Sequence, residues 1–124
     1  MPTTDTLDGE AATTFRSPPV GNTYLGLSAL RLGLPARAAA PLARCREMAA
    51  ALPLPAASTL EVVELARCFH TSGELAQSTG DTPAARTYFQ QALNAWQAGI
   101  DRPQSRPYLK TEHAKTAAAL AKLP

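Results

Sequence analysis

The chain has 124 residues, enough for one ordinary domain or a short stack of repeats. Its net charge of +2 gives no reason to expect nucleic acid or an anionic membrane as a partner. No apolar run approaches the roughly 20 residues that a membrane-spanning helix needs. We therefore expect a globular chain that binds neither nucleic acid nor a membrane.

The N-terminus and the cysteines predict a protein that stays in the cytoplasm. Residues 1–14 contain acidic side chains where a signal peptide needs basic ones, and they lack an apolar centre. Two cysteines, Cys45 and Cys68, are too few for a disulfide framework. We therefore expect both to be buried, inert thiols in a reducing compartment.

Residues 1–18 differ in composition from the rest of the chain. They are rich in threonine and acidic residues, and Leu7 and Phe15 are their large apolar pair. This composition predicts a disordered tail, followed by a helical domain over residues 19–124. The alternative is an acidic arm that folds back on a basic groove.

The first helix is expected over residues 22–32. Asn22 or Thr23 would cap its start by accepting from the first free amides, and Gly33 would end it in a left-handed conformation. Its apolar stripe at helical spacing comprises Leu25, Ala29 and Leu32.

A second helix is expected over residues 35–52. Pro35 suits the first turn because its missing N–H and fixed φ cost nothing there. Pro41, about two turns in, should weaken or bend the helix. One face of this helix collects Ala38, Leu42, Cys45, Ala49 and Leu52.

The third helix has the clearest start signal. Ser58 and Glu61 form the S-x-x-E pattern of a capping box, in which each side chain satisfies the other residue's backbone amide. Gly80 is expected to end this helix. Its apolar stripe comprises Val62, Ala66, Phe69, Gly73 and Ala76, widened by Val63 and Leu65.

Two more helices complete an all-α fold of about five helices. Asp81 or Thr82 would cap the fourth, with Pro83 in its first turn and Gly99 at its end. The fifth is expected over residues 107–123, and no segment shows the sustained alternation of a strand. The apolar stripes are Ala85, Tyr88, Phe89, Ala92, Leu93 and Trp96 in the fourth helix, and Leu109, His113, Thr116, Leu120 and Leu123 in the fifth.

One pattern of small and large residues occurs twice, 47 positions apart. A small residue in the first helix of a pair lets the second helix approach closely. A large residue of the second helix then fills the space over the small residue. Hairpins built in this way leave an apolar face open and must stack on a neighbour. The two sets are Gly26, Gly33, Ala38, Leu42 and Cys45, and Gly73, Gly80, Ala85, Phe89 and Ala92.

Residues 66–99 resemble a tetratricopeptide repeat (TPR), and residues 19–52 resemble it more weakly through Leu25-Gly26. Phe69, Gly73, Ala85, Phe89 and Ala92 stand at the family's Trp, Gly, Ala, aromatic and small positions. The long spacing resembles the repeats of bacterial regulators. The resemblance implies a short right-handed stack of antiparallel helix hairpins, a TPR-like α-solenoid, with the fifth helix as its C-terminal cap.

The resemblance also implies where a partner would bind, because helix A of each repeat lines the family's concave face. The positions carried over are Tyr24, Leu27, Leu30 and Arg31 in the first unit, and Arg67, His70, Glu74 and Gln77 in the second. They imply a non-catalytic protein–protein interaction module, an adaptor, chaperone-like or regulatory protein, that binds a peptide or helix. Glu74 replaces the Asn with which some members clamp a carboxylate, so we do not expect that clamp. Alternatively, Leu27 and Leu30 pack on the N-terminal tail or on a neighbour's core.

The sequence offers little for catalysis, metals or cofactors. His70 and His113, with the two cysteines, lack the spacing of metal ligands. Glu61 and Glu64, one turn apart, are expected on a solvated helix face, and Trp96 in the core. We expect no enzyme, no metal and no cofactor. The alternatives are a self-associating assembly protein, such as a homodimer, or a remnant of a larger repeat array.

Overall fold

The structure, a computed structural model, describes residues 20–124 and is all-helical there. The all-α prediction is confirmed for this range, whereas the tail expected over residues 1–18 falls outside it. The elements are α2 (Val20–Arg31), α3 (Pro35–Ala50), the 3₁₀ turn η1 (Leu54–Ala56), α4 (Thr59–Ser78), α5 (Thr82–Ile100) and α6 (Pro107–Ala121).

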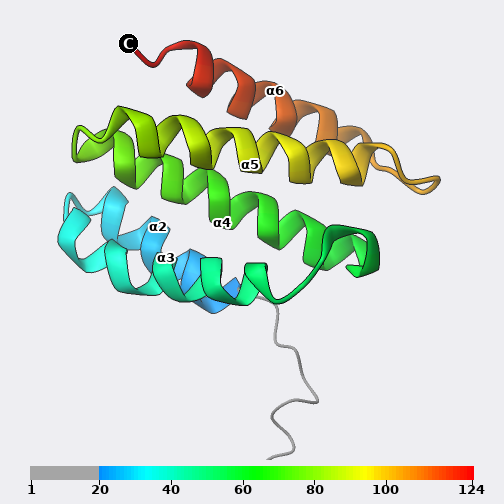
Figure 1. Cartoon of the computed structure of the whole chain (residues 1–124), viewed down its shortest axis with the longest axis horizontal. Helices are drawn as coiled ribbons and strands as arrows, with labels where there is room; N and C mark the ends of the chain where they lie inside the picture. The colour runs from blue at the N-terminus through cyan, green and yellow to red at the C-terminus, as the bar shows by residue number, and fades with distance from the viewer. Residues whose placement is uncertain (1–19) are drawn as a thin grey trace, which may run out of the picture.

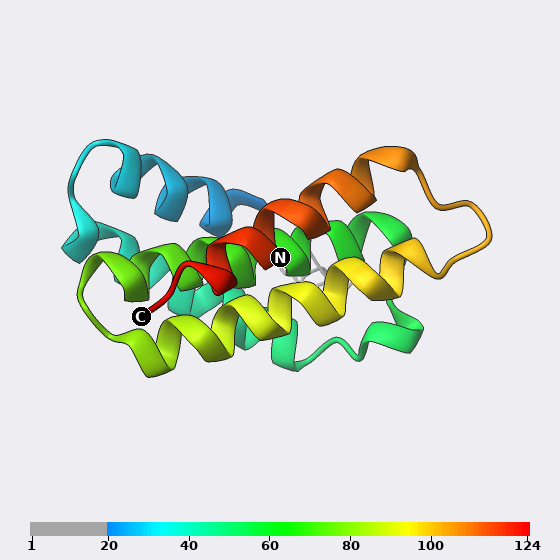
Figure 2. The same ribbon diagram turned by 90° about the horizontal axis from the view of Figure 1, so that it is seen from above.

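Consecutive helices form hairpins that stack in layers (Figure 1). The α2–α3 hairpin packs against α4, the α4–α5 hairpin follows, and α6 lies on α5. Figure 2 shows α2 and the first half of α6 on one side of the stack, with α3 and α5 on the other. This packing is consistent with a helical bundle or a helical repeat.

Most helix boundaries follow the signals in the sequence. The Ser58–Glu61 capping box forms, with Ser58 N donating to Glu61 Oε1 at 2.7 Å and Glu61 N donating to Ser58 Oγ at 3.1 Å. Asp81 caps α5 through Ala84 N. The two glycines that end α2 and α4 adopt positive φ angles of 74° and 81°, which L-residues rarely tolerate.

Two predicted boundaries are wrong. Because α2 already begins at Val20, Asn22 lies inside the helix and does not cap it. Its side chain instead accepts from Arg44 Nε at 3.3 Å on α3. Gly99 lies inside α5, which continues to Ile100. A Cβ at Gly99 would sit 3.2 Å from Leu109 Cδ1, so the glycine lets α6 approach α5 closely.

The two hairpins close in the same way. A Cβ at Gly26 would lie 2.5 Å from Leu42 Cγ, and one at Gly73 would lie 2.7 Å from Phe89 Cδ1. Leu42 and Phe89 are fully buried, as are Ala38 and Ala85. In each hairpin a large side chain therefore occupies the space that a glycine leaves on the facing helix. This confirms the packing expected from the repeated pattern of small residues.

The buried face of α2 is not the predicted one. Leu25 and Leu32 are 56% and 74% exposed, and only Ala29 of the expected stripe is buried. The helix instead turns Thr23, Gly26 and Ala29 inward. Because Gly26 must face Leu42, the helix turns Leu25 and Leu32 away from the core. Close approach of the backbone thus takes precedence over burying the larger side chains.

The C-terminal helix covers the open face of the second hairpin, as predicted. Leu109 is buried against α4 and α5. Leu120 and Leu123 pack on the cluster around Phe89. No helix within residues 20–124 combines the length and hydropathy needed to cross a bilayer.

A disulfide joins Cys45 on α3 to Cys68 on α4, so the expectation of two free thiols is wrong. Both residues are fully buried, and their Cα atoms lie 6.2 Å apart. The repeated pattern places Cys45 at a small, inward position, and Cys68 meets it from the next layer. Since disulfides persist mainly in oxidising compartments, this bond removes the cysteine argument for the cytoplasmic expectation.

We expect Gly73→Ala to lower the free energy of unfolding by about 1 kcal/mol or more. The overpacking cost of about 1–3 kcal/mol outweighs the gain in helix propensity of up to about 1 kcal/mol. Gly21→Ala is the matched control, because nothing lies within 4 Å of a Cβ there. Urea denaturation measures both variants. Equal stability of the two variants would contradict the close contact between Gly73 and Phe89.

We expect the double variant Cys45→Ala/Cys68→Ala to lose about 2–4 kcal/mol of stability relative to the oxidised chain. The bond closes a loop with a sequence separation of 23 and so restricts the unfolded chain. Urea denaturation with and without reductant measures the effect, and reductant should leave the double variant unchanged. Titration of two thiols in the unfolded wild-type chain under non-reducing conditions would rule out the bond.

Candidate functional site

A pocket of about 490 Å³ opens where α2, α4 and α6 come together. Helical spacing of three and four residues aligns its lining on each helix. The lining residues are Thr23, Tyr24, Leu27 and Arg31 of α2, Glu64, Arg67, His70, Thr71 and Glu74 of α4, Trp96 of α5, and Glu112 and Lys115 of α6. We call this pocket the α2–α4–α6 groove.

Six of the eight residues predicted to bind a partner line this one groove. They are Tyr24, Leu27, Arg31, Arg67, His70 and Glu74. The other two lie elsewhere. Leu30 packs against the core cluster around Leu42, which fits the alternative that it is a packing residue. Gln77, one turn beyond Glu74, is exposed and outside the lining.

Sequence reasoning missed two groups of lining residues. Glu64 and Thr71 lie three and four positions from Arg67, so the helical period alone places them on the same face of α4. Glu112 and Lys115 come from α6, for which the sequence predicted only a capping role. Their place in the groove depends on how α6 crosses the stack, which no local signal reveals.

Three carboxylates and three cationic side chains line the groove. Glu112 pairs with Lys115 at 3.1 Å, Glu64 with Arg67 at 3.5 Å, and Glu74 lies 3.7 Å from His70 Nε2. Among the described side chains Arg31 has no ion-pair partner. Within residues 20–124 no three His, Cys, Asp or Glu side chains gather closely enough to hold a metal ion.

The prediction that Glu61 and Glu64 lie on a solvated face is wrong. Both are buried, with 8% and 7% of their surface exposed. Glu61 is held in the capping box at the start of α4. Glu64, less than a turn further on, lies in the lining of the groove. The two carboxylates therefore have different roles and do not form an acid–base pair.

A buried hydroxyl fixes the floor of the groove. Thr116 on α6 is fully buried, and its Oγ1 accepts from Trp96 Nε1 at 3.0 Å. The same oxygen lies 2.8 Å from His70 Nδ1. Which of the two groups donates in this second contact depends on the tautomer of His70, because a threonine hydroxyl can both donate and accept. The network joins α4, α5 and α6 through three side chains.

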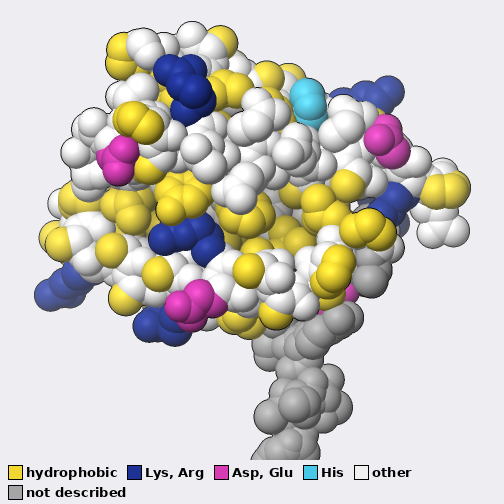
Figure 3. All heavy atoms as spheres, in the orientation of Figure 1, with side chains coloured by type: hydrophobic (Ala, Val, Ile, Leu, Met, Phe, Trp, Pro, Cys, Tyr) yellow, Lys and Arg dark blue, Asp and Glu magenta, His cyan; other side chains and the backbone are white. Residues whose placement is uncertain are grey.

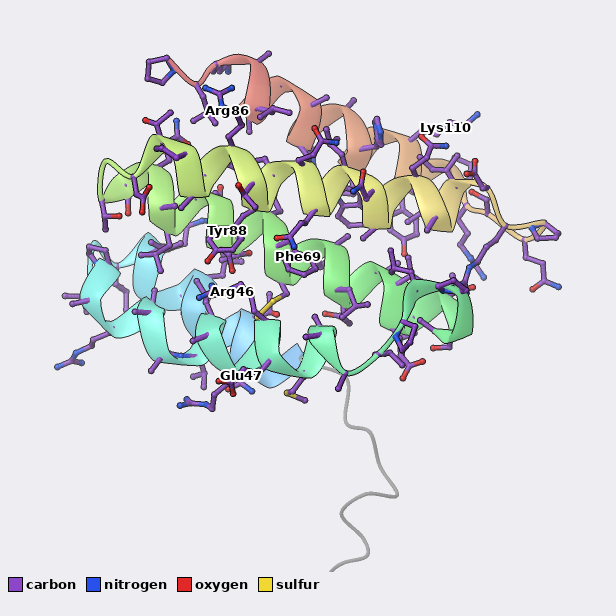
Figure 4. The ribbon with its side chains drawn as sticks, in the orientation of Figure 1. Arg46, Glu47, Phe69, Arg86, Tyr88 and Lys110 are labelled. Atoms are coloured by element: carbon purple, nitrogen blue, oxygen red, sulfur yellow. A yellow bond between two sulfur atoms is a disulfide. The ribbon has the colours of Figure 1, made fainter. Side chains whose placement is uncertain are left out.

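The opposite side of the stack is joined by a different set of contacts. Arg46 on α3 lies 4.7 Å from the ring centre of Tyr88 on α5, and donates to Ser72 Oγ at 2.8 Å (Figure 4). Figure 3 shows this side as a band of hydrophobic side chains, interrupted by basic ones, between α3 and the α4–α5 hairpin. Ser72 is fully buried, and its hydroxyl accepts this hydrogen bond from the arginine.

A second hollow, of about 610 Å³, lies at the α5–α6 connection. Its two charged side chains are already engaged within the chain. Arg102 donates to the Leu54 carbonyl at 3.0 Å, and Asp101 accepts from Gln97 at 2.8 Å. No sequence feature predicted a site there. We therefore take the α2–α4–α6 groove as the candidate functional site.

Comparison with known proteins identifies no relative. No protein-family model, curated protein or solved structure matches the chain. The candidate site therefore depends on the geometry described above.

We expect Thr116→Val to lower the free energy of unfolding by about 1–3 kcal/mol. Valine keeps the shape but leaves the buried Trp96 N–H without its acceptor. Thr111→Val, at an exposed position of the same helix, is the matched control. Urea denaturation gives the stability, and the indole N–H resonance of Trp96 reports the hydrogen bond. If the resonance stays in place and both variants unfold alike, the network is absent.

Proposed function

We propose that this chain is a non-catalytic protein-binding module that holds a short helix or an extended segment of a partner in the α2–α4–α6 groove. The observation that carries the proposal is the convergence of predicted positions on one pocket. Six residues that the repeat register predicts for the concave face line the same cavity from two helices. Helical spacing puts the residues of each helix on one face, and the stacking of α2 against α4 brings the two faces together in one pocket.

The wall of the groove suits a peptide. Tyr24 is 70% exposed, and Leu27 lies one turn further along the same face of α2. An exposed aromatic beside an aliphatic side chain can pack on an apolar anchor of a partner at a low cost in conformational entropy. Paired charges surround them, so the groove can also accept polar groups along the edge of a bound segment.

We propose further that the stack is a TPR-like solenoid of two repeats. The equivalent contacts of Gly26 with Leu42 and of Gly73 with Phe89 support this assignment. The position of α6 also supports this assignment. It lines the groove beside α2 and α4, where the first helix of a third repeat would lie. On this view the chain shares the adaptor or chaperone-like role of such repeats. In a reducing cytoplasm Cys45 and Cys68 would be free thiols, whereas in an oxidising compartment they would form the disulfide.

A second candidate function is self-association. Leu25 on the outer face of α2 and Leu32, directly after the end of the helix, are both largely exposed. Burying such a face against a second copy would make the chain a homodimer. Light scattering distinguishes the two functions, because a mass that stays monomeric at every concentration contradicts self-association.

We expect Tyr24→Ala to weaken peptide binding by about tenfold, because an aromatic anchor in the middle of an interface commonly contributes more than 1 kcal/mol. The probes are peptides selected from a random display library on the full-length chain. Their binding is followed by the fluorescence of Trp96, the single tryptophan. Tyr108→Ala, a half-exposed tyrosine of α6 outside the lining, is the matched control and should bind normally.

Two results would contradict the proposed function. One is a library selection that yields no peptide above background. The other is a set of selected peptides that bind the wild type, Tyr24→Ala and Tyr108→Ala equally well, because these peptides would then bind outside the groove.

A further inference from the structure

Glu64 places a buried carboxylate in the wall of the α2–α4–α6 groove. Its side chain is only 9% exposed, yet it lines the groove. Its ion pair with Arg67 spans 3.5 Å, and it makes no hydrogen bond within the described chain. Burying a carboxylate with so little compensation is unfavourable, because the charge loses its hydration without gaining hydrogen bonds. In a stable fold such a group calls for a functional explanation.

The charges of the groove are ordered by depth. The carboxylates of Glu64 and Glu112 are 9% and 28% exposed, whereas their partners Arg67 and Lys115 are 49% and 66% exposed. The negative ends therefore lie inside the groove and the positive ends near its mouth. Glu74 adds a third carboxylate, and its neighbour His70 is charged only when protonated. A positive group that enters the groove would meet carboxylates that water reaches poorly.

The apolar lining suits the rest of a basic side chain. Lys and Arg carry alkyl stems that pack on apolar surface while the charged head seeks a counter-ion. Leu27 and Tyr24 offer that surface on α2, across the groove from Glu64 on α4. The ring of Tyr24 can also attract a cation over its face. An acidic side chain could meet the exposed Arg31 at the mouth of the groove, but further in it would approach the carboxylates of Glu64 and Glu112 and would be repelled.

We propose that the groove selects partner segments that insert one basic side chain, arginine or lysine, next to an apolar residue, with Glu64 as the counter-ion of the inserted group. This inference rests on the proposed function, since it names the chemistry of the segment that the groove holds. Binding then supplies the hydrogen bonds that Glu64 lacks in the free chain and displaces Arg67 toward solvent. The inserted group thus converts a costly buried charge into a charge-assisted contact.

A matched set of peptides tests this selection on the full-length, oxidised chain. The peptides carry Arg, Met or Glu at one central position between leucine and alanine residues, and binding is followed by Trp96 fluorescence. We expect the Arg peptide to bind about tenfold more tightly than the Met peptide, and the Glu peptide more weakly than both. Raising the salt concentration should reduce the difference between the Arg and Met peptides.

Substitutions in the chain then identify the counter-ion. Glu64→Gln should abolish the preference for Arg over Met. Glu47→Gln, at an exposed site of α3 outside the groove lining, should keep it (Figure 4). If Glu64→Gln fails to give the wild-type circular dichroism spectrum, Glu74→Gln replaces it. That side chain is 40% exposed and is expected to reduce the preference by severalfold.

The outcomes separate this inference from the proposed function. Equal binding of the Arg, Met and Glu peptides overturns the inference, and so does a preference for Arg that survives both Glu64→Gln and Glu74→Gln. The inference is also overturned if no peptide of the set binds. In each case library peptides that depend on Tyr24 would still support a binding groove. If those peptides are absent too, the proposed function fails with the inference.

Discussion

The whole stack depends on two places where a glycine lets a neighbouring helix come unusually close. At Gly26 and Gly73 the position of a side chain is taken by Leu42 and Phe89 from the next helix. Both large residues are fully buried, so the hairpins close around them. Once the hairpins are closed, the remaining apolar faces can be buried only by stacking, and stacking brings α2, α4 and α6 to one side. The groove therefore depends on the contacts of Gly26 with Leu42 and of Gly73 with Phe89, which lie inside the hairpins and not in the groove itself.

The groove differs from the core in how its polar groups are satisfied. At its floor, Thr116 links Trp96 to His70, so helices from three positions in the chain hold one another in a fixed arrangement. Above that floor the charges are incompletely matched, and Glu64 stands out because it is buried without a hydrogen bond to any residue within 20–124. The rigid floor holds the lining side chains in place, and the carboxylate of Glu64 can still accept hydrogen bonds from a partner. This contrast favours a binding role for the groove.

Much of the fold could be predicted from local chemistry. Ser58, Gly80 and Asp81 set helix ends through capping and backbone conformation, which depend on near neighbours alone. The face of α2 could not be predicted in this way, because Gly26 outweighs the larger Leu25 only when Leu42 is known to lie opposite. The same limit applies to Cys45 and Cys68, whose bond depends on how the layers align. At the groove, the contributions of α6 were hidden for the same reason, whereas Glu64 and Thr71 follow from the helical period of α4.

The most direct test of this account is a nuclear Overhauser measurement on the folded chain. The account predicts strong contacts between the α-protons of Gly73 and the ring protons of Phe89, and between those of Gly26 and the methyl groups of Leu42. Both pairs are far apart in the sequence, so only the proposed hairpin packing brings them together. Absence of both sets of contacts in a folded, helical sample would contradict the packing and, with it, the groove that the packing creates.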